Sequence, residues 1–137
     1  MLEILSAGLP LVFTLDTLLM VVVGVLFGLF VGALPGLGPL MGMVLVLPFV
    51  IGAAPVPAIG LLTAIFVAGS CGGSISAILL GIPGTPLAAA TLLDGFPMAK
   101  SGRGSDAIGI AIAASSIGGL FGGAILIVFT PMLAALA

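Results

Sequence analysis

The sequence predicts an all-α, polytopic integral membrane protein with discontinuous or re-entrant helices and about four to five membrane segments. Hydrophobic residues make up 62% of the 137 positions and charged residues only 4%, which lies far outside the range of soluble domains. At roughly 20 residues for each full membrane helix, this length holds about four or five crossing or half-crossing segments. Proline and glycine clusters interrupt the apolar runs, so some segments are expected to stop within the membrane. Residues 1–137 are therefore expected to form a single transmembrane unit.

Composition also limits the classes of function. Two basic and four acidic residues are too few for a surface that binds nucleic acid. The chain has no histidine, which removes Ser-His and Cys-His nucleophilic pairs and histidine metal sites. Its one cysteine, Cys71, excludes an internal disulfide and, between Ser70 and Gly72, is expected to be a small packing residue. No catalytic residue, metal site or resident cofactor is predicted, and the chain is expected not to be an enzyme.

The first full helix is expected over residues 17–34. Residues 1–13 are apolar but short, and they are expected either to lie in the membrane interface or to pack as a partial helix. Thr14 or Asp16 is expected to cap the following helix. Three glycines recur in this helix at four-residue spacing and predict a face for close contact with a second helix. They are Gly24, Gly28 and Gly32.

Two interruptions divide the apolar sequence. The first, residues 33–39, precedes a short helix over residues 40–51. The second, residues 69–86, holds the apolar run 75–80, which is too short to span a bilayer. A half-helix beginning near Ser74 would direct free N–H groups toward an interior site, as in the discontinuous helices of transporters. The alternatives are a tight glycine-mediated helix crossing with serines bonded to their own backbone, or a pair of surface turns.

Turn residues predict where the helices on either side of the second interruption begin and end. A turn over residues 53–57 leads into a helix over 58–68, which runs into the interruption. Residues 87–93 are expected to be a short helix that ends at a turn over residues 94–97, Asp-Gly-Phe-Pro.

The last part of the chain is predicted to be a polar loop and a long helix. The loop, residues 98–105, holds Lys100 and Arg103, and the positive-inside rule places it in the cytoplasm. Ser105 or Asp106 is expected to cap the helix over residues 107–137, with a bend or an end at Pro131. Four glycines of this helix predict another close contact with a neighbouring helix, and two serines are expected to bond within or between helices. These residues are Gly118, Gly119, Gly122, Gly123, Ser115 and Ser116.

Three motifs follow one another in the chain and together resemble a known family. They are Gly-Ala-Leu-Pro-Gly-Leu-Gly-Pro-Leu-Met-Gly at 32–42, Gly-Gly-Ser-Ile-Ser-Ala-Ile-Leu-Leu-Gly-Ile-Pro-Gly at 72–84 and Asp-Gly-Phe-Pro-Met-Ala-Lys at 94–100. In this order they resemble the signatures of the large membrane subunit of tripartite tricarboxylate transporters. The resemblance covers nearly all of the chain, which would form the N-terminal part of a longer, two-repeat subunit.

The resemblance implies a function and a set of partners. Such a subunit is the permease of a secondary transporter in the bacterial inner membrane, which takes up tricarboxylates or related small carboxylates. It would be coupled to Na⁺ or H⁺ and would work with a small membrane subunit and a periplasmic substrate-binding protein. The alternative from another class is a helical membrane scaffold, or a truncated fragment, without transport activity.

The expected site residues lie at the two interruptions and just beyond them. Asp94 and Thr85 are candidates for cation coupling, although Asp94 could instead form an Asx-type turn at the membrane edge. Lys100 and Arg103 could attract an anionic substrate or anchor the chain at the interface. The residues expected to contact the carboxylate substrate are Gly36, Gly38, Gly72, Gly73, Ser74, Ser76, Gly84 and Thr85.

Overall fold

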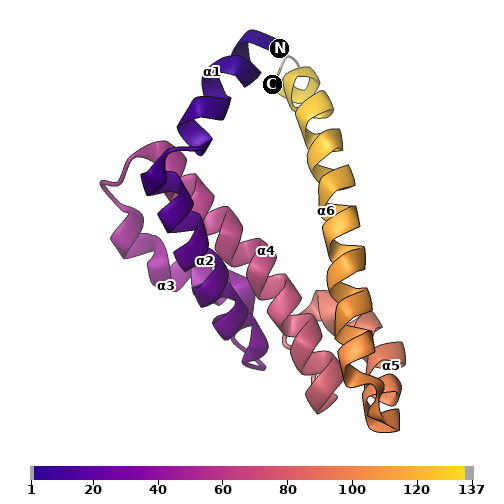
Figure 1. Cartoon of the computed structure of the whole chain (residues 1–137). Helices are drawn as coiled ribbons and strands as arrows, with labels where there is room; N and C mark the ends of the chain where they lie inside the picture. The colour runs from indigo at the N-terminus through magenta and orange to yellow at the C-terminus, as the bar shows by residue number, and fades with distance from the viewer. Residues whose placement is uncertain (1, 135–137) are drawn as a thin grey trace.

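The computed structural model describes residues 2–134 and is helical throughout, with no strand among the described residues (Figure 1). Three helical stretches, Leu15–Ala33, Pro55–Leu80 and Pro86–Leu133, are long and apolar enough to cross a membrane. The all-α class is confirmed, and the chain is a multi-pass membrane protein. The elements are α1 (Leu2–Val12), α2 (Leu15–Ala33), α3 (Gly38–Val50), α4 (Pro55–Leu80), η1 (Pro86–Ala88), α5 (Ala89–Met98), η2 (Ala99–Arg103) and α6 (Gly104–Ala134).

Helix α2 begins at the predicted cap, Thr14. The Thr14 hydroxyl accepts a hydrogen bond from the Thr17 backbone N–H at 3.4 Å and lies 2.8 Å from the Thr17 hydroxyl. The buried Thr17 hydroxyl donates in turn to the Leu11 carbonyl at 3.1 Å, which joins the end of α1 to the start of α2. Because the cap is Thr14 and not Asp16, the helix starts at Leu15, two residues before the predicted position.

The predicted glycine face of α2 packs directly on α4. A Cβ atom added to Gly24 would lie 2.8 Å from the Ala64 Cβ, and one added to Gly28 would lie 2.7 Å from the Ile65 carbonyl oxygen. A Cβ atom at Gly32 would run into the backbone of Gly69. The two helices therefore touch backbone to backbone, as small residues at a helix crossing allow.

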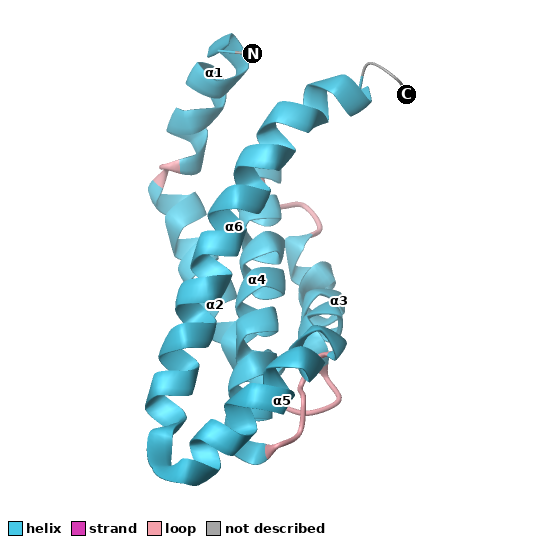
Figure 2. Cartoon of the chain, turned by 90° about the vertical axis from the view of Figure 1, so that its right-hand side faces the viewer, coloured by secondary structure: helices cyan, strands magenta, loops and turns pink. Residues whose placement is uncertain are grey.

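Helix α3 covers another side of this pair (Figure 2). A Cβ atom at Gly42 would lie 3.1 Å from the Ile65 Cγ2, and one at Gly69 would lie 2.8 Å from the Pro39 Cβ. With 13 residues, α3 is shorter than a full membrane helix, as predicted for the segment after the first interruption.

Helix α4 runs without interruption for 26 residues, so the predicted half-helix beginning near Ser74 is wrong. The serines bond back to the helix: Ser70 donates to the Phe66 carbonyl at 2.9 Å, and Ser74 donates to the Ser70 carbonyl at 3.4 Å. Gly72 serves close packing, because a Cβ atom there would lie 2.6 Å from the Leu29 carbonyl oxygen of α2. The alternative of a glycine-mediated crossing with back-bonded serines is therefore the correct one.

The second interruption lies later than predicted, directly after Leu80. Gly81 ends α4 in the left-handed conformation, with φ +71° and ψ 17°. The left-handed backbone conformation at Gly81 is unfavourable for a residue with a side chain. A Cβ atom there would also lie 2.7 Å from the Phe96 ring. The chain then runs through residues 82–85 into η1.

The predicted turn over residues 94–97 is wrong, because α5 continues through it to Met98. Gly95 is a packing residue and not a turn residue, since a Cβ atom there would lie 2.7 Å from the Ile78 Cγ1 of α4. The chain reverses instead at Gly102, whose φ of +83° suits glycine. The reversal lies within the predicted polar loop, so α5 and α6 form a hairpin.

Both basic residues of this hairpin have partners within it. Lys100 Nζ lies 4.6 Å from the centre of the Phe96 ring, and Arg103 Nε donates to Asp106 at 3.1 Å. Both partners of the ion pair are exposed. Lys100 and Arg103 are both exposed, which is compatible with a place at the membrane interface.

Helix α6 packs on α4 and α5 near its start and then diverges from the other helices (Figure 1). It continues through Pro131 to Ala134, so the helix does not end at that proline. Every residue from 112 to 133 is exposed. The close contact predicted for four of its glycines is not made within the described part of the chain, where no atom lies within 4 Å of a Cβ position at Gly118, Gly119, Gly122 or Gly123.

Candidate functional site

The two interruptions of the sequence meet in space against the middle of α4. The backbone N–H of Gly84 donates to the Gly73 carbonyl at 3.3 Å, so the segment after α4 folds back along that helix. A Cβ atom at Gly84 would run into the Gly32 carbonyl oxygen, and one at Gly38 would lie 3.8 Å from the Gly84 carbonyl oxygen. We call this group the break cluster, defined as Gly32, Gly38, Gly73, Ser76, Gly84 and Thr85.

The hydroxyl groups of the break cluster hold its backbone in place. The Ser76 hydroxyl donates to the Gly73 carbonyl at 2.9 Å. The Thr85 hydroxyl accepts a hydrogen bond from the Ala88 N–H at 3.3 Å and so caps η1. Both side chains are about 3% exposed, and a Cβ atom at Gly73 would lie 2.6 Å from the Thr85 Cγ2. These two residues therefore fix the second interruption rather than present free groups to a ligand.

The accessible part of this region is the first interruption. Residues 34–37 are all exposed. At Gly36, no atom lies within 4 Å of the position that a Cβ atom would take. Leu37 gives α3 no side-chain cap, so the N–H groups of the first turn of α3 have no such partner. Uncapped N–H groups at a helix N-terminus favour an anion.

The predicted site residues thus divide into three groups. The structure brings together Gly38, Gly73, Ser76, Gly84 and Thr85, with Gly36 in the exposed loop just before Gly38. Gly72 instead contacts α2, where a Cβ atom would lie 2.9 Å from the Ala33 backbone nitrogen. Ser74 and Asp94 lie at a separate place.

That separate place is a cavity of about 240 Å³ between α4, α5 and α6. Its polar lining comes from Ser74 on α4, Thr91 and Asp94 on α5, and Ser115 on α6. We call it the hairpin cavity. The cavity is open to the outside of the chain, since Asp94 and Ser115 are exposed while Ser74 and Thr91 are half-buried. Thr85 does not line it, so the two residues expected to couple a cation occupy different places.

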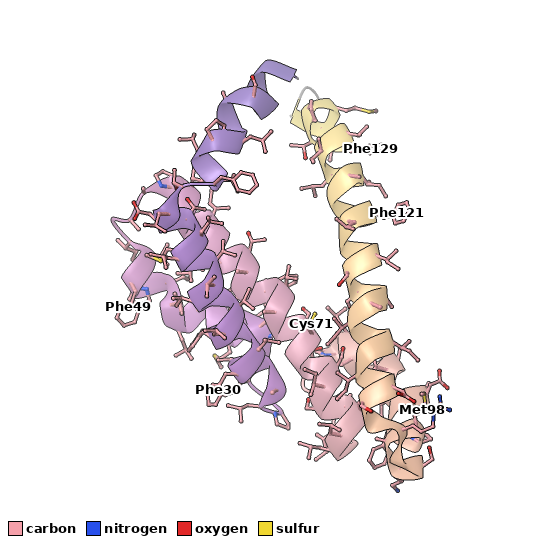
Figure 3. All side chains as sticks on the ribbon, viewed as in Figure 1. Phe30, Phe49, Cys71, Met98, Phe121 and Phe129 are labelled. Atoms are coloured by element: carbon pink, nitrogen blue, oxygen red, sulfur yellow. The ribbon has the colours of Figure 1, made fainter. Side chains whose placement is uncertain are left out.

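A neighbouring cavity of about 360 Å³ shares three of these residues, Ser74, Thr91 and Ser115. It extends along α4 to Ser70 and Cys71. Figure 3 shows Cys71 on the side of α4 that faces α6. The cysteine therefore lies beside the hairpin cavity without lining it.

The sequence did not identify Thr91 as part of a site, and it assigned Ser115 only to hydrogen bonds within or between helices. Thr91 precedes Asp94 by three residues, which places both on one face of a helix. The Asp-Gly-Phe-Pro sequence at 94–97 is typical of a turn, and this pattern conceals the helical spacing of Thr91 and Asp94.

A larger apolar groove, of about 790 Å³, runs along α2 and α4 on the side of α6. Val21, Val25, Val67 and Ala68 are among its lining residues. Its lining is almost entirely apolar, so it suits hydrophobic surfaces and not a charged solute.

Comparison with known proteins supports the resemblance seen in the sequence. Residues 18–137 match the model of a family described as the tripartite tricarboxylate transporter TctA family. Over 133 residues the chain is 35% identical to a protein of Agrobacterium vitis described as an uncharacterized 52.8 kDa protein in the TAR-I ttuC' 3'region. The match covers 97% of this chain and 26% of that relative, so the chain spans about a quarter of the relative's length. No solved structure matches the chain.

The family match includes both interruptions, the hairpin and all of the helices except α1 and the start of α2. The chain belongs to the tripartite tricarboxylate transporter TctA family.

Proposed function

We propose that this chain is the N-terminal membrane part of a cation-coupled permease that takes up tricarboxylates or related small carboxylates. The permease would lie in the bacterial inner membrane and would work with a small membrane subunit and a periplasmic substrate-binding protein. Family membership supports the transport class. The observation that carries the proposal is the meeting of the two interruptions against α4, because interrupted helices build the substrate sites of many secondary transporters.

In this proposal the substrate carboxylates bind at the first interruption. The uncapped first turn of α3 offers N–H groups and the positive end of a helix dipole. Gly36 and Gly38 carry no side chains, so an anion can approach the backbone closely. Thr85 and Ser76 hold the second interruption behind this surface through the hydrogen bonds described above. The rest of the site would come from the second, related half of the permease.

The packing also supports a division into two moving parts. The backbone contact between α2 and α4 makes these helices a rigid unit, together with α3. The α5–α6 hairpin reverses at Gly102 and packs on only one end of α4. A rocking motion of one unit against the other would give alternating access to the site. The basic hairpin turn would face the cytoplasm.

Uptake of labelled citrate tests this proposal. The complete permease is expressed with both partner proteins in cells that have no other citrate transport, and Gly38→Leu is compared with the parent. Gly38 has φ +63°, where a residue with a side chain costs about 1–2 kcal/mol. That cost corresponds to about a tenfold loss of uptake rate if the site needs this backbone arrangement.

Gly109→Leu is the matched control, because Gly109 is helical and no atom lies within 4 Å of its Cβ position. Both variants are compared at equal amounts of permease in the membrane. If the parent assembles with its partners but accumulates no citrate, or if Gly38→Leu transports as fast as Gly109→Leu, the proposal is wrong. Assembly without transport would instead support the scaffold.

A further inference from the structure

We propose that the hairpin cavity binds a sodium ion, with Asp94 as its charged ligand and Ser74, Thr91 and Ser115 as neutral oxygen ligands. The inference rests on the proposed function in that the ion would be the coupling cation. Its evidence is independent of the substrate site, since none of these four residues belongs to the break cluster.

Asp94 is the first reason to expect a cation. Asp94 lies in the apolar stretch Pro86–Leu133, and a carboxylate in such a stretch is rare and generally marks a functional site. Within the described chain no basic side chain pairs with it: Arg103 binds Asp106, and Lys100 lies over the Phe96 ring. The negative charge in the cavity is thus available to an ion.

The hydroxyl groups are the second reason. Serines and threonines in membrane helices usually donate to a carbonyl one turn earlier, as Ser70, Ser116 and Thr130 do here. Among the described residues, Thr91 and Ser115 make no side-chain hydrogen bond, and both line the cavity that holds Asp94. Ser74 donates to the Ser70 carbonyl and keeps its lone pairs for a ligand. A bound cation would satisfy all three oxygens.

The donor set selects the class of ion. All of the ligands are oxygen atoms, which suit hard cations. No group of three or more His, Cys, Asp or Glu side chains occurs in the described chain, which argues against a transition metal. A single carboxylate neutralises one positive charge, whereas a divalent ion would leave a net charge within the membrane. An anionic substrate would be repelled by Asp94.

The position of the cavity gives the ion a role. Its ligands come from α4, α5 and α6, so binding would hold the α5–α6 hairpin against α4. Helix α5 follows directly on η1, which Thr85 of the break cluster caps. The ion would therefore favour one position of the hairpin and, through η1, one arrangement of the second interruption.

Cys71 offers a direct measurement of binding. The rate of alkylation of Cys71 by N-ethylmaleimide is measured in the complete permease at increasing NaCl, with choline chloride keeping the ionic strength constant. The Cys71→Ser variant gives the background from any other thiol. Because the cysteine lies in the neighbouring cavity, closure of the hairpin by Na⁺ is expected to slow alkylation severalfold.

The variants Asp94→Asn and Asp106→Asn separate a specific site from a general effect of charge. In Asp94→Asn the NaCl concentration at half effect is expected to rise by at least about tenfold, since even outer partners of metal ligands contribute that much. Asp106→Asn should behave as the parent, because Asp106 lies outside the cavity and binds Arg103. A rate that does not respond to Na⁺ in the parent, or an unchanged midpoint in Asp94→Asn, overturns the proposal.

A second matched pair applies if Asp94→Asn does not fold. Ser115→Ala is expected to raise the midpoint severalfold, whereas Ser116→Ala should not, because Ser116 is bonded to the Ile112 carbonyl at 2.8 Å and does not line the cavity. Equal midpoints in the two variants overturn the proposal. Alkylation reports binding without uptake, so a sodium response in a permease that accumulates no citrate would support this site and contradict the proposed function.

Discussion

Replacement of Gly32 by alanine is expected to destabilise the packing of α2 on α4 by about 3 kcal/mol, the upper part of the range for an overpacked core. A Cβ atom at this position would lie 2.5 Å from the Gly69 Cα and 2.6 Å from its carbonyl carbon. Backbone atoms of a neighbouring helix have no rotamer by which to move away. The two helices would have to separate along the whole glycine face.

The test of Gly32→Ala is decisive, because helix propensity alone predicts that this substitution stabilises the protein. Alanine is favoured over glycine within a helix by about 1 kcal/mol. Gly109→Ala is the control, since no atom lies within 4 Å of its Cβ position and propensity should decide its effect. Thermal unfolding of the purified permease in detergent measures both variants. A Gly32→Ala variant as stable as the parent would show that α2 and α4 do not touch at this point.

Alanine substitution at Gly73 or at Gly84 is expected to cost about 2–3 kcal/mol each and to abolish most citrate uptake. At Gly73 the new methyl group would lie 2.6 Å from the Thr85 Cγ2, and at Gly84 it would lie 2.8 Å from the Ser76 hydroxyl oxygen. Either change pushes the second interruption away from α4 and breaks the hydrogen bond from Gly84 to Gly73.

A double variant, with alanine at both Gly73 and Gly84, tests whether the two substitutions destabilise the protein by displacing the same segment. Because both substitutions displace the same segment, the double variant should cost clearly less than the sum of the single variants. Their free energies of unfolding are compared in the same detergent. Strictly additive losses would mean that Gly73 and Gly84 act at separate places, which contradicts the break cluster.

Much of the core could be predicted from the sequence because its signals are local. The four-residue spacing of Gly24, Gly28 and Gly32 is visible without a structure, and it correctly indicated a helix contact. The first interruption was also predictable, because proline and glycine within residues 33–39 stop a helix whatever surrounds it. The Thr14 cap likewise depends only on its immediate neighbours.

The errors came from glycines whose role depends on a distant partner. A Gly-Ser cluster is compatible both with a helix tip and with close packing, and only the Leu29 carbonyl near Gly72 decides between them. The role of Gly95 likewise depends on a distant residue, because Gly95 packs against Ile78 of α4. The hairpin cavity was missed because Ser115 reaches it from a helix far along the chain.

The most direct test of the meeting of the two interruptions is a cross-link between them. Leu37→Cys and Pro83→Cys are combined with Cys71→Ser in the complete permease and treated with a short bismaleimide in membrane vesicles. The structure predicts efficient cross-linking within one chain, because these residues are next to Gly38 and Gly84. Citrate should slow the reaction if it binds there. Absence of the cross-link would contradict the break cluster, and a cross-link that citrate leaves unchanged would contradict its role in substrate binding.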